Sequence, residues 1–121
     1  MSKGALKGEA AVKRAVTDLL DAERIPWWRM NAGGTLVQSK GKTYRIAGAQ
    51  AGTADILAAP ICKFGCCKPK FLWIECKRPK GGVQSDAQKE FQRFIVEQGH
   101  EYMIATSSDD VLDKLRRMVC E

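Results

Sequence analysis

The sequence contains no long hydrophobic run. No apolar segment approaches the roughly 20 residues that a membrane-spanning helix needs. The first residues, Met1 to Gly4, also lack the apolar core of a signal peptide. These absences argue against a membrane-embedded or secreted protein, and we expect the chain to stay in the cytoplasm of a bacterium or of a phage-infected host cell.

Histidine is nearly absent, and the five cysteines form no regular pattern. A structural zinc site usually has four ligands in spaced pairs. The loop that follows Pro60 offers only Cys62, Cys66 and Cys67, and the single histidine, His100, lies far along the chain. An odd number of cysteines with an adjacent pair also fits reduced thiols better than a disulfide framework. Free thiols are the favoured interpretation, and a zinc ion shared across a dimer is the alternative.

The length and charge of the chain restrict its architecture and its partners. With 121 residues it is long enough for one domain with a real core and too short for two. We therefore treat residues 1–121 as a single domain. Lysine and arginine number 20 against 14 acidic residues, which gives a net charge of +6. This excess favours a polyanionic partner, and nucleic acid is the leading candidate.

The first element is predicted to be a helix over residues 8–24, ended by Pro26. Val12 and Val16 begin a stripe of apolar residues at helical spacing, and Glu9 lies on this stripe one turn before Val12. The remaining polar residues fall mostly on the other side of the helix: Lys13, Arg14, Thr17, Asp18 and Asp21.

The rest of the chain alternates between strand and helix patterns. The predicted elements are an extended segment at 27–31, a hairpin formed by 35–38 and 43–46, strands at 55–59 and 71–77, a helix at 86–98, a strand at 102–105 and a last helix capped by Ser107 or Ser108. Apart from the hairpin, the order is helix, three strands, helix, strand, helix. The helix at 86–98 has the length of a crossover between parallel strands. We therefore expect an α/β fold with a central mixed sheet flanked by helices. The side chains expected in the core include Trp27, Trp28, Ala87, Phe91, Phe94 and Ile95. For the two tryptophans the alternative is that one of them stacks on an unpaired base.

Charged residues occur at the ends of two predicted core strands, in Gly52-Thr53-Ala54-Asp55 and in Ile74-Glu75-Cys76-Lys77. A buried ionised carboxylate is costly unless it is paired or bound to a metal. If the two strands pair as a hairpin, Asp55 and Glu75 meet at one edge of the sheet, and alternation places Lys77 on the face of Glu75. Mg²⁺ typically uses one or two carboxylates and keeps several waters. The pattern predicts a divalent metal site that acts on a phosphodiester, and a solvent-facing ion pair is the alternative.

These motifs, together with Ser85-Asp86-Ala87-Gln88, resemble the PD-(D/E)XK nuclease superfamily, and more specifically its virus-type replication-repair nuclease (VRR-NUC) branch. The resemblance covers nearly the whole chain and implies a restriction-endonuclease-like αβββαβα core. It also implies Mg²⁺- or Mn²⁺-dependent cleavage of DNA, often at flaps, branches or junctions. The chain departs from the superfamily motif at Ala54, where the motif has proline, and in the cysteine loop.

The resemblance further implies a role for each residue of the site. The metal ligands would be Asp55, Glu75 and the main-chain carbonyl of Cys76, with Glu9 as a first-helix acid that helps to hold the metal or to orient its water. Lys77 would be the catalytic lysine. Gln88 would match the glutamine of the helix that follows the lysine strand, a residue of the catalytic site whose side chain could hold Lys77 or a phosphate.

Two of these residues also have structural interpretations. Gln88 forms a Ser-x-x-Gln capping box with Ser85, and because one amide cannot fully face two ways, we expect the capping role and the site role to coexist only in part. Glu9 could equally be a helix-start acid favoured by the helix dipole. The resemblance favours the site role for Glu9.

Basic residues surround the acidic strands in the sequence. They suit contacts to phosphates, which orient nucleic acid without reading its sequence. We assign this role to Arg78 and Lys80, which directly follow Lys77, and to Lys42 and Arg45 of the predicted hairpin. The remaining members of this group are Lys40, Lys63, Lys68 and Lys70.

The sequence thus predicts a metal-dependent DNA endonuclease that selects for structure more than for sequence and that could act as a homodimer. The alternatives are a non-catalytic nucleic-acid-binding module with a nuclease fold, and an RNA-cleaving enzyme that uses the same site.

Overall fold

The computed structural model describes residues 8–30, 35–46, 49–60 and 70–118, without the side chains of Thr35, Val37, Arg45 and Ile46. The elements are α1 (Glu9–Ala22), β1 (Trp27–Arg29), β2 (Thr35–Ser39), β3 (Lys42–Ile46), β4 (Ile56–Ala58), β5 (Leu72–Cys76), α2 (Asp86–Glu97), β6 (Glu101–Ala105) and α3 (Ser108–Arg117). The protein is therefore a mixed α/β fold, as expected. Each predicted element is present, and its ends fall within a residue or two of the predicted ones.

The main sheet has four strands in the order β1-β4-β5-β6. β4 pairs antiparallel with both β1 and β5, whereas β6 pairs parallel with β5. The parallel pair is possible because α2 connects the two strands and returns the chain to the edge of the sheet where β5 begins. Both predicted pairings, the antiparallel one before α2 and the parallel one after it, are confirmed.

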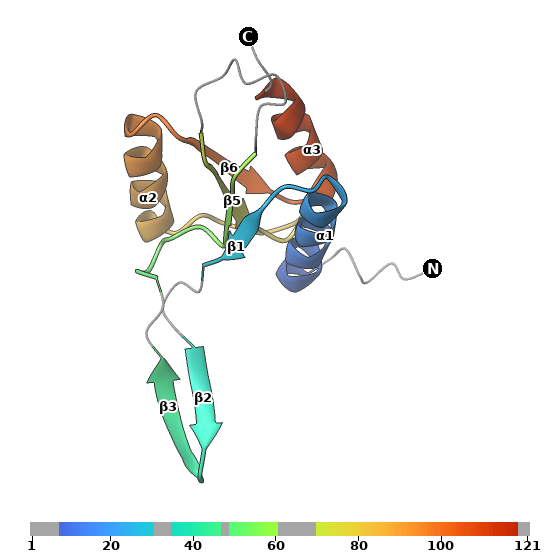
Figure 1. Cartoon of the computed structure of the whole chain (residues 1–121). Coiled ribbons are helices and arrows are strands. Elements are labelled where there is room, and N and C mark those ends of the chain that lie inside the picture. The colour runs from blue at the N-terminus through green and yellow to red at the C-terminus, as the bar shows by residue number, and fades with distance from the viewer. Residues whose placement is uncertain (1–7, 31–34, 47–48, 61–69, 119–121) are drawn as a thin grey trace.

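Helices cover both faces of this sheet (Figure 1). Leu72, Ile74 and Cys76 of β5 face the larger core, which α1 and α3 complete with Val16 and Val111. The alternate residues of β5 face α2, where a smaller cluster forms. In that cluster Trp73 packs edge-on against Phe91, with ring centroids 5.0 Å apart. Alternation along β5 therefore sends its apolar residues to two separate cores.

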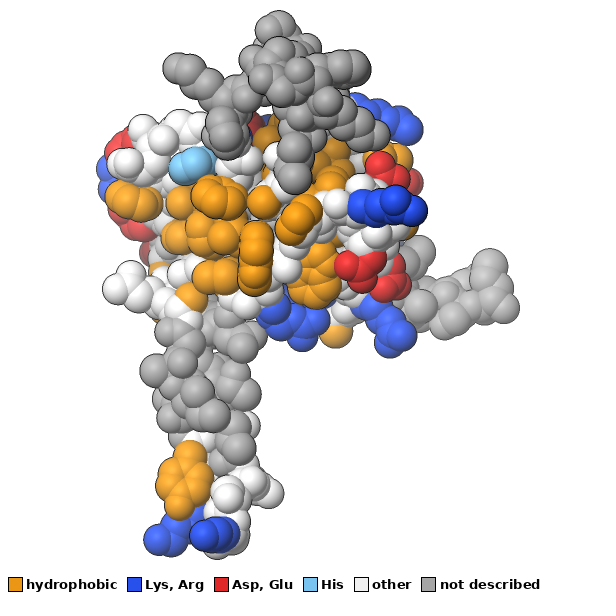
Figure 2. Space-filling view, in the orientation of Figure 1, with side chains coloured by type: hydrophobic (Ala, Val, Ile, Leu, Met, Phe, Trp, Pro, Cys, Tyr) orange, Lys and Arg blue, Asp and Glu red, His pale blue; other side chains and the backbone are white. Residues whose placement is uncertain are grey.

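The second sheet is a hairpin of β2 and β3, which extends away from the body of the protein (Figure 1). Lys40 and Gly41 connect its strands with φ angles of 51° and 75°, and two successive residues with positive φ are typical of a tight two-residue hairpin turn. Leu36 and Tyr44 are exposed on this hairpin. Basic side chains gather at its far end (Figure 2).

Three of the expected core residues are exposed. Trp27 packs against the larger core, but its neighbour Trp28 is 51% exposed, because adjacent residues of a strand point to opposite faces. Phe94 is 58% exposed, because α2 presents Phe91 and Ile95 to the sheet instead. Ala87, in the first turn of α2, is exposed as well. The expectation that Trp28, Ala87 and Phe94 lie in the core is therefore wrong.

Among the described residues, no helix combines the length and the hydrophobicity required to cross a membrane.

Candidate active site

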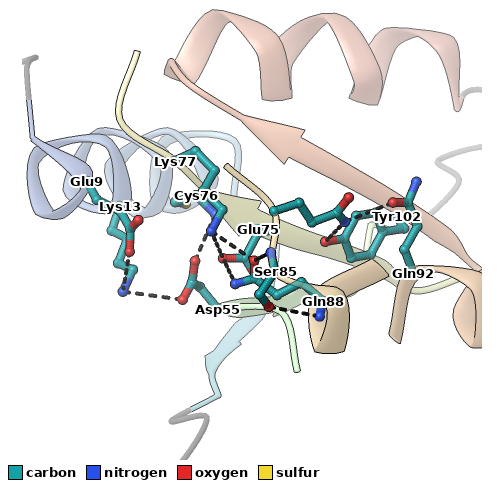
Figure 3. A network of polar contacts seen from close by, with 11 residues as sticks. Glu9, Lys13, Asp55, Glu75, Cys76, Lys77, Ser85, Gln88, Gln92 and Tyr102 are labelled. Carbon is teal, nitrogen blue, oxygen red and sulfur yellow. Dashed lines mark hydrogen bonds and ion pairs between the residues drawn. The ribbon is translucent and has the colours of Figure 1, made fainter. Parts of the chain in front are cut away.

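The acidic residues Asp55 and Glu75 meet at one edge of the main sheet. Asp55 directly precedes β4, and Glu75 lies near the end of β5; the antiparallel register pairs Ile56 with Ile74, so these two positions adjoin. One carboxylate oxygen of Asp55, Oδ2, accepts a hydrogen bond of 2.8 Å from the main-chain N–H of Cys76 (Figure 3). The structure therefore brings the two carboxylates together at the sheet edge where the sequence places them.

Glu75 is one of the most deeply buried polar residues, and only 3% of its side chain is exposed. Its Oε2 atom accepts a hydrogen bond of 3.0 Å from Nε2 of Gln88. Its Oε1 atom is buried and has no hydrogen-bond partner within the described part of the chain. Burial raises the pKa of Glu75 to about 8, and the nearby Asp55 carboxylate adds to this rise. Glu75 therefore has a carboxylate oxygen that an added cation would stabilise.

Lys77 lies on the same face as Glu75 and has a fixed position. Its Nζ atom donates a hydrogen bond of 2.9 Å to Oε1 of Gln88 and lies 3.7 Å from Oε2 of Glu75. Only 12% of the lysine side chain is exposed. The following loop passes close over it, because a Cβ atom on Gly82 would lie 2.8 Å from Cβ of Lys77. The ammonium group is thus held beside the acidic pair by contacts on several sides.

Gln88 performs both of the roles that the sequence suggests. Its Oε1 atom accepts from the main-chain N–H of Ser85 at 2.8 Å as well as from Lys77, while its own N–H donates to the Ser85 hydroxyl at 3.1 Å. The amide oxygen has two lone pairs, and the amide nitrogen remains free to face Glu75. The expectation that the two roles coexist only in part is therefore wrong: the capping box at the start of α2 orients the amide toward the site.

The first helix reaches the site through a residue that the sequence analysis did not select. Lys13 extends its Nζ atom to within 3.3 Å of Oδ1 of Asp55 and 3.7 Å of Oε2 of Glu9 (Figure 3). Glu9 itself is about half exposed and is connected to Asp55 through this lysine. The placement of Lys13 on the polar side of the helix is thus incomplete, because its long side chain curls back to the sheet edge. The sequence signal that could have identified Lys13 was Asp55, an acidic residue at a strand end for which the sequence offered no basic partner.

Cys76 contributes its main chain to the site and its side chain to the core. The thiol is fully buried between the sheet and the helices, and burial raises its pKa to about 12, so it stays protonated. The described contact with Asp55 uses the N–H of Cys76. The predicted use of its carbonyl oxygen as a metal ligand stays a prediction.

An open groove adjoins the site between the start of α1 and the loop after β5. Its lining includes Glu9, Lys77 and Arg78, with Gly8, Gly81, Gly82 and Val83 completing it. Lys80 is exposed in the same loop. The groove therefore combines a fixed ammonium, a guanidinium and a carboxylate.

The other predicted phosphate contacts lie elsewhere or outside the described residues. Lys42 belongs to β3, in the hairpin that extends away from the sheet (Figure 1). The side chain of Arg45 is outside the described part, although its main chain pairs with Leu36. The loop residues Cys62, Lys63, Cys66, Cys67 and Lys68 all lie outside the described residues.

The donor set at this sheet edge is small but suits a divalent metal. Within residues 8–30, 35–46, 49–60 and 70–118, no three or more His, Cys, Asp or Glu side chains are grouped as a metal would need. Two carboxylates are present, Asp55 and Glu75, and Mg²⁺ commonly binds through one or two carboxylates while keeping several waters. The buried Oε1 of Glu75, which has no partner among the described residues, is the observation that fits a metal.

Comparisons of this chain with protein-family models, with curated proteins and with solved structures gave no match.

Proposed function

We propose that this protein is a metal-dependent DNA endonuclease of the PD-(D/E)XK type, resembling the VRR-NUC branch, that hydrolyses phosphodiester bonds and prefers branched, flap or junction DNA. The observation that carries the proposal is the environment of Glu75. Its buried carboxylate lies beside Asp55 and has one oxygen without a described partner. Burying a carboxylate in this position destabilises the fold, and the binding of a metal ion would offset that cost.

The order of elements supports the same proposal. If the β2–β3 hairpin is set aside as an insertion, the chain runs helix, three strands, helix, strand, helix around a mixed sheet. This is the order that the resemblance implies for a restriction-endonuclease-like core. The proposed site lies at the edge where β4 begins and β5 ends.

Asp55 and Glu75 would hold Mg²⁺ or Mn²⁺, with Glu9 and the Cys76 carbonyl as the further ligands that the resemblance implies. Such an ion supplies activation of water and neutralisation of charge on the reacting phosphate.

The protein's own contribution is positional. Lys77 holds a positive charge beside the acidic pair, where it stabilises negative charge that develops on the phosphate. Gln88 fixes both the lysine and Glu75, and the capping box fixes Gln88. Arg78 in the adjoining groove and Lys80 in its loop would contact neighbouring phosphates.

The hairpin supplies a second contact region for DNA. No acidic residue occurs between Met30 and Asp55 in the sequence, whereas Lys40, Lys42 and Arg45 do. A two-stranded ribbon with this charge suits the backbone of a duplex or a branch. A single domain of this size covers little DNA, so we also propose a homodimer as the active form.

Cleavage assays test the proposal on branched DNA, linear duplex DNA and RNA, each with Mg²⁺, Mn²⁺ or EDTA. We expect metal-dependent cleavage of DNA that is fastest on branched substrates. Asp55→Asn and Glu75→Gln should abolish cleavage while they preserve the fold, because Asn and Gln can still accept the hydrogen bonds from Cys76 and Gln88.

Asp18→Asn and Glu90→Gln are matched controls on the exposed faces of α1 and α2. Binding without cleavage by the wild-type protein would favour the non-catalytic module, and cleavage of RNA alone would favour the ribonuclease.

A further inference from the structure

Lys13 occupies a position that the proposed metal site does not explain. Its ammonium bridges Asp55 on one side and Glu9 on the other, at 3.3 Å and 3.7 Å. Partial burial by itself lowers the pKa of Lys13, but the carboxylates of Asp55 and Glu9 outweigh it and raise the pKa above its usual value. A positive charge is therefore already present between two of the carboxylates that are expected to serve a metal.

We propose that Lys13 is a tethered competitor for the divalent cation: its ammonium holds Asp55 in the metal-free protein and must leave Asp55 Oδ1 when a metal binds. This inference rests on the proposed function, since it concerns the same acidic pair. It adds a role for a residue that neither the motifs nor the resemblance selects.

The geometry supports exchange rather than a permanent ion pair. Oδ2 of Asp55 is held by the Cys76 N–H, so Oδ1 is the oxygen left for a cation, and Lys13 is the group that contacts it. The lysine side chain is about one-third exposed. A flexible, partly solvated lysine can therefore turn outward without unfolding its helix.

The ammonium of Lys13 also stabilises the metal-free protein, because it pairs with the carboxylate of Asp55 at 3.3 Å. It therefore offsets a negative charge that lies beside the buried Glu75. The same ammonium then repels an incoming divalent ion. Removing the charge of Lys13 should therefore have two opposite effects, a less stable metal-free protein and tighter metal binding.

The test measures Mn²⁺ affinity by calorimetry and by the electron paramagnetic resonance of free Mn²⁺, on the full chain without DNA. We expect Lys13→Met to bind Mn²⁺ about 10-fold more tightly than wild type, the scale of one charge–charge interaction a few ångströms long at a partly exposed site. Lys13→Gln, with a shorter neutral side chain, should behave in the same way.

Arg14→Gln is the matched control. It removes the same charge from the neighbouring, exposed position of α1, so it changes the overall electrostatics without touching Asp55. Its Mn²⁺ affinity should stay within about 2-fold of wild type. Damage to the fold would weaken metal binding, so tighter binding distinguishes competition from a structural role.

Thermal unfolding supplies a second readout. Without metal, Lys13→Met should melt below wild type, and saturating Mn²⁺ should close this gap because it stabilises the tighter binder more. Equal affinities of Lys13→Met, Arg14→Gln and wild type would overturn the role of Lys13 while the metal site stands. Absence of Mn²⁺ binding by every variant would overturn the metal site itself, and the competitor with it.

Discussion

Gln88 donates a hydrogen bond from Nε2 to the buried Oε2 of Glu75 at 3.0 Å, while its Oε1 receives one from Lys77 at 2.9 Å. One amide thus contacts a carboxylate with its donor and an ammonium with its acceptor. The capping box with Ser85 holds this amide in place. Helix capping and the arrangement of the site therefore depend on the same side chain.

Gln88→Glu separates these two roles. A glutamate at this position still completes the capping box, but it cannot donate to Glu75 and places a second carboxylate against it. We expect little loss of helix capping and a loss of DNA cleavage of at least ~10-fold, because the arrangement of Lys77 and Glu75 is disturbed. Steady-state cleavage and urea unfolding measure the two effects.

Ser85→Ala is the complementary variant. It removes the cap hydroxyl, with an expected loss of about 1 kcal/mol of stability, but leaves the contacts of Gln88 with Glu75 and Lys77. It should retain most of the cleavage activity. Equal activity losses in both variants would mean that capping alone accounts for the effect of Gln88.

Lys77→Met tests the fixed ammonium. Removing a positive charge placed beside the reacting phosphate should reduce the cleavage rate at least ~100-fold, with the fold retained because methionine fills a similar volume. Lys89→Met, on an exposed position of α2, is the control and should cleave like wild type. If Lys77→Met instead binds Mn²⁺ more weakly, the lysine supports the metal site and its assignment to the phosphate is wrong.

The buried Glu75 makes the metal-free protein sensitive to pH. Burial raises its pKa from 4.5 to about 8 in the folded state, so the folded protein holds a proton that the unfolded chain releases. The contribution of Glu75 to stability is therefore complete below the unfolded pKa and is lost as the pH rises through about 8.

Urea unfolding in EDTA at a series of pH values checks this direction. The free energy of unfolding of wild type should fall across the window between the two pKa values, and Glu75→Gln should show a flatter profile because it has no proton to lose. Glu90→Gln, on the exposed face of α2, should keep the wild-type slope. A wild-type slope in Glu75→Gln would assign the pH dependence to other groups.

The hairpin charges should matter for DNA binding rather than for folding. The double variant Lys40→Gln/Lys42→Gln removes two positive charges near the hairpin turn, and the slope of log affinity against log salt should become shallower by about 2. Filter binding of a branched DNA at several salt concentrations measures it. Arg116→Gln/Arg117→Gln removes the same charge from the end of α3 and should leave the slope near that of wild type.

Gly52 fixes the distance between the strand that follows it and α2. Its φ angle is 92°, and a Cβ atom there would lie 2.4 Å from the carbonyl oxygen of Ala87. Gly52→Ala should therefore destabilise the protein by more than ~2 kcal/mol, through backbone strain and overpacking together. Gly99→Ala isolates the first contribution, because Gly99 has a φ angle of 86° and open space around it. If Gly52→Ala and Gly99→Ala lose the same stability in urea unfolding, α2 shifts enough to accommodate the added methyl group.

The secondary structure and the acidic pair could be predicted from the sequence because both depend on local patterns. Apolar periodicity marks α1, and the charged residues at the ends of the predicted apolar strands 55–59 and 71–77 mark the site. The positions of Trp28 and Phe94 could not be predicted in this way, because periodicity shows which residues are apolar but not how much of each sheet face the helices cover.

The sequence by itself determined the order of elements, the position of Asp55 and Glu75 at paired strand ends, and the excess of positive charge. Only the tertiary structure decided that Lys13 reaches Asp55, that Gln88 joins three partners at once and that one oxygen of Glu75 lacks a described partner. The physical reason is that strand and helix patterns act over a few neighbouring residues, whereas hydrogen bonds and burial depend on groups that the chain brings together from distant positions.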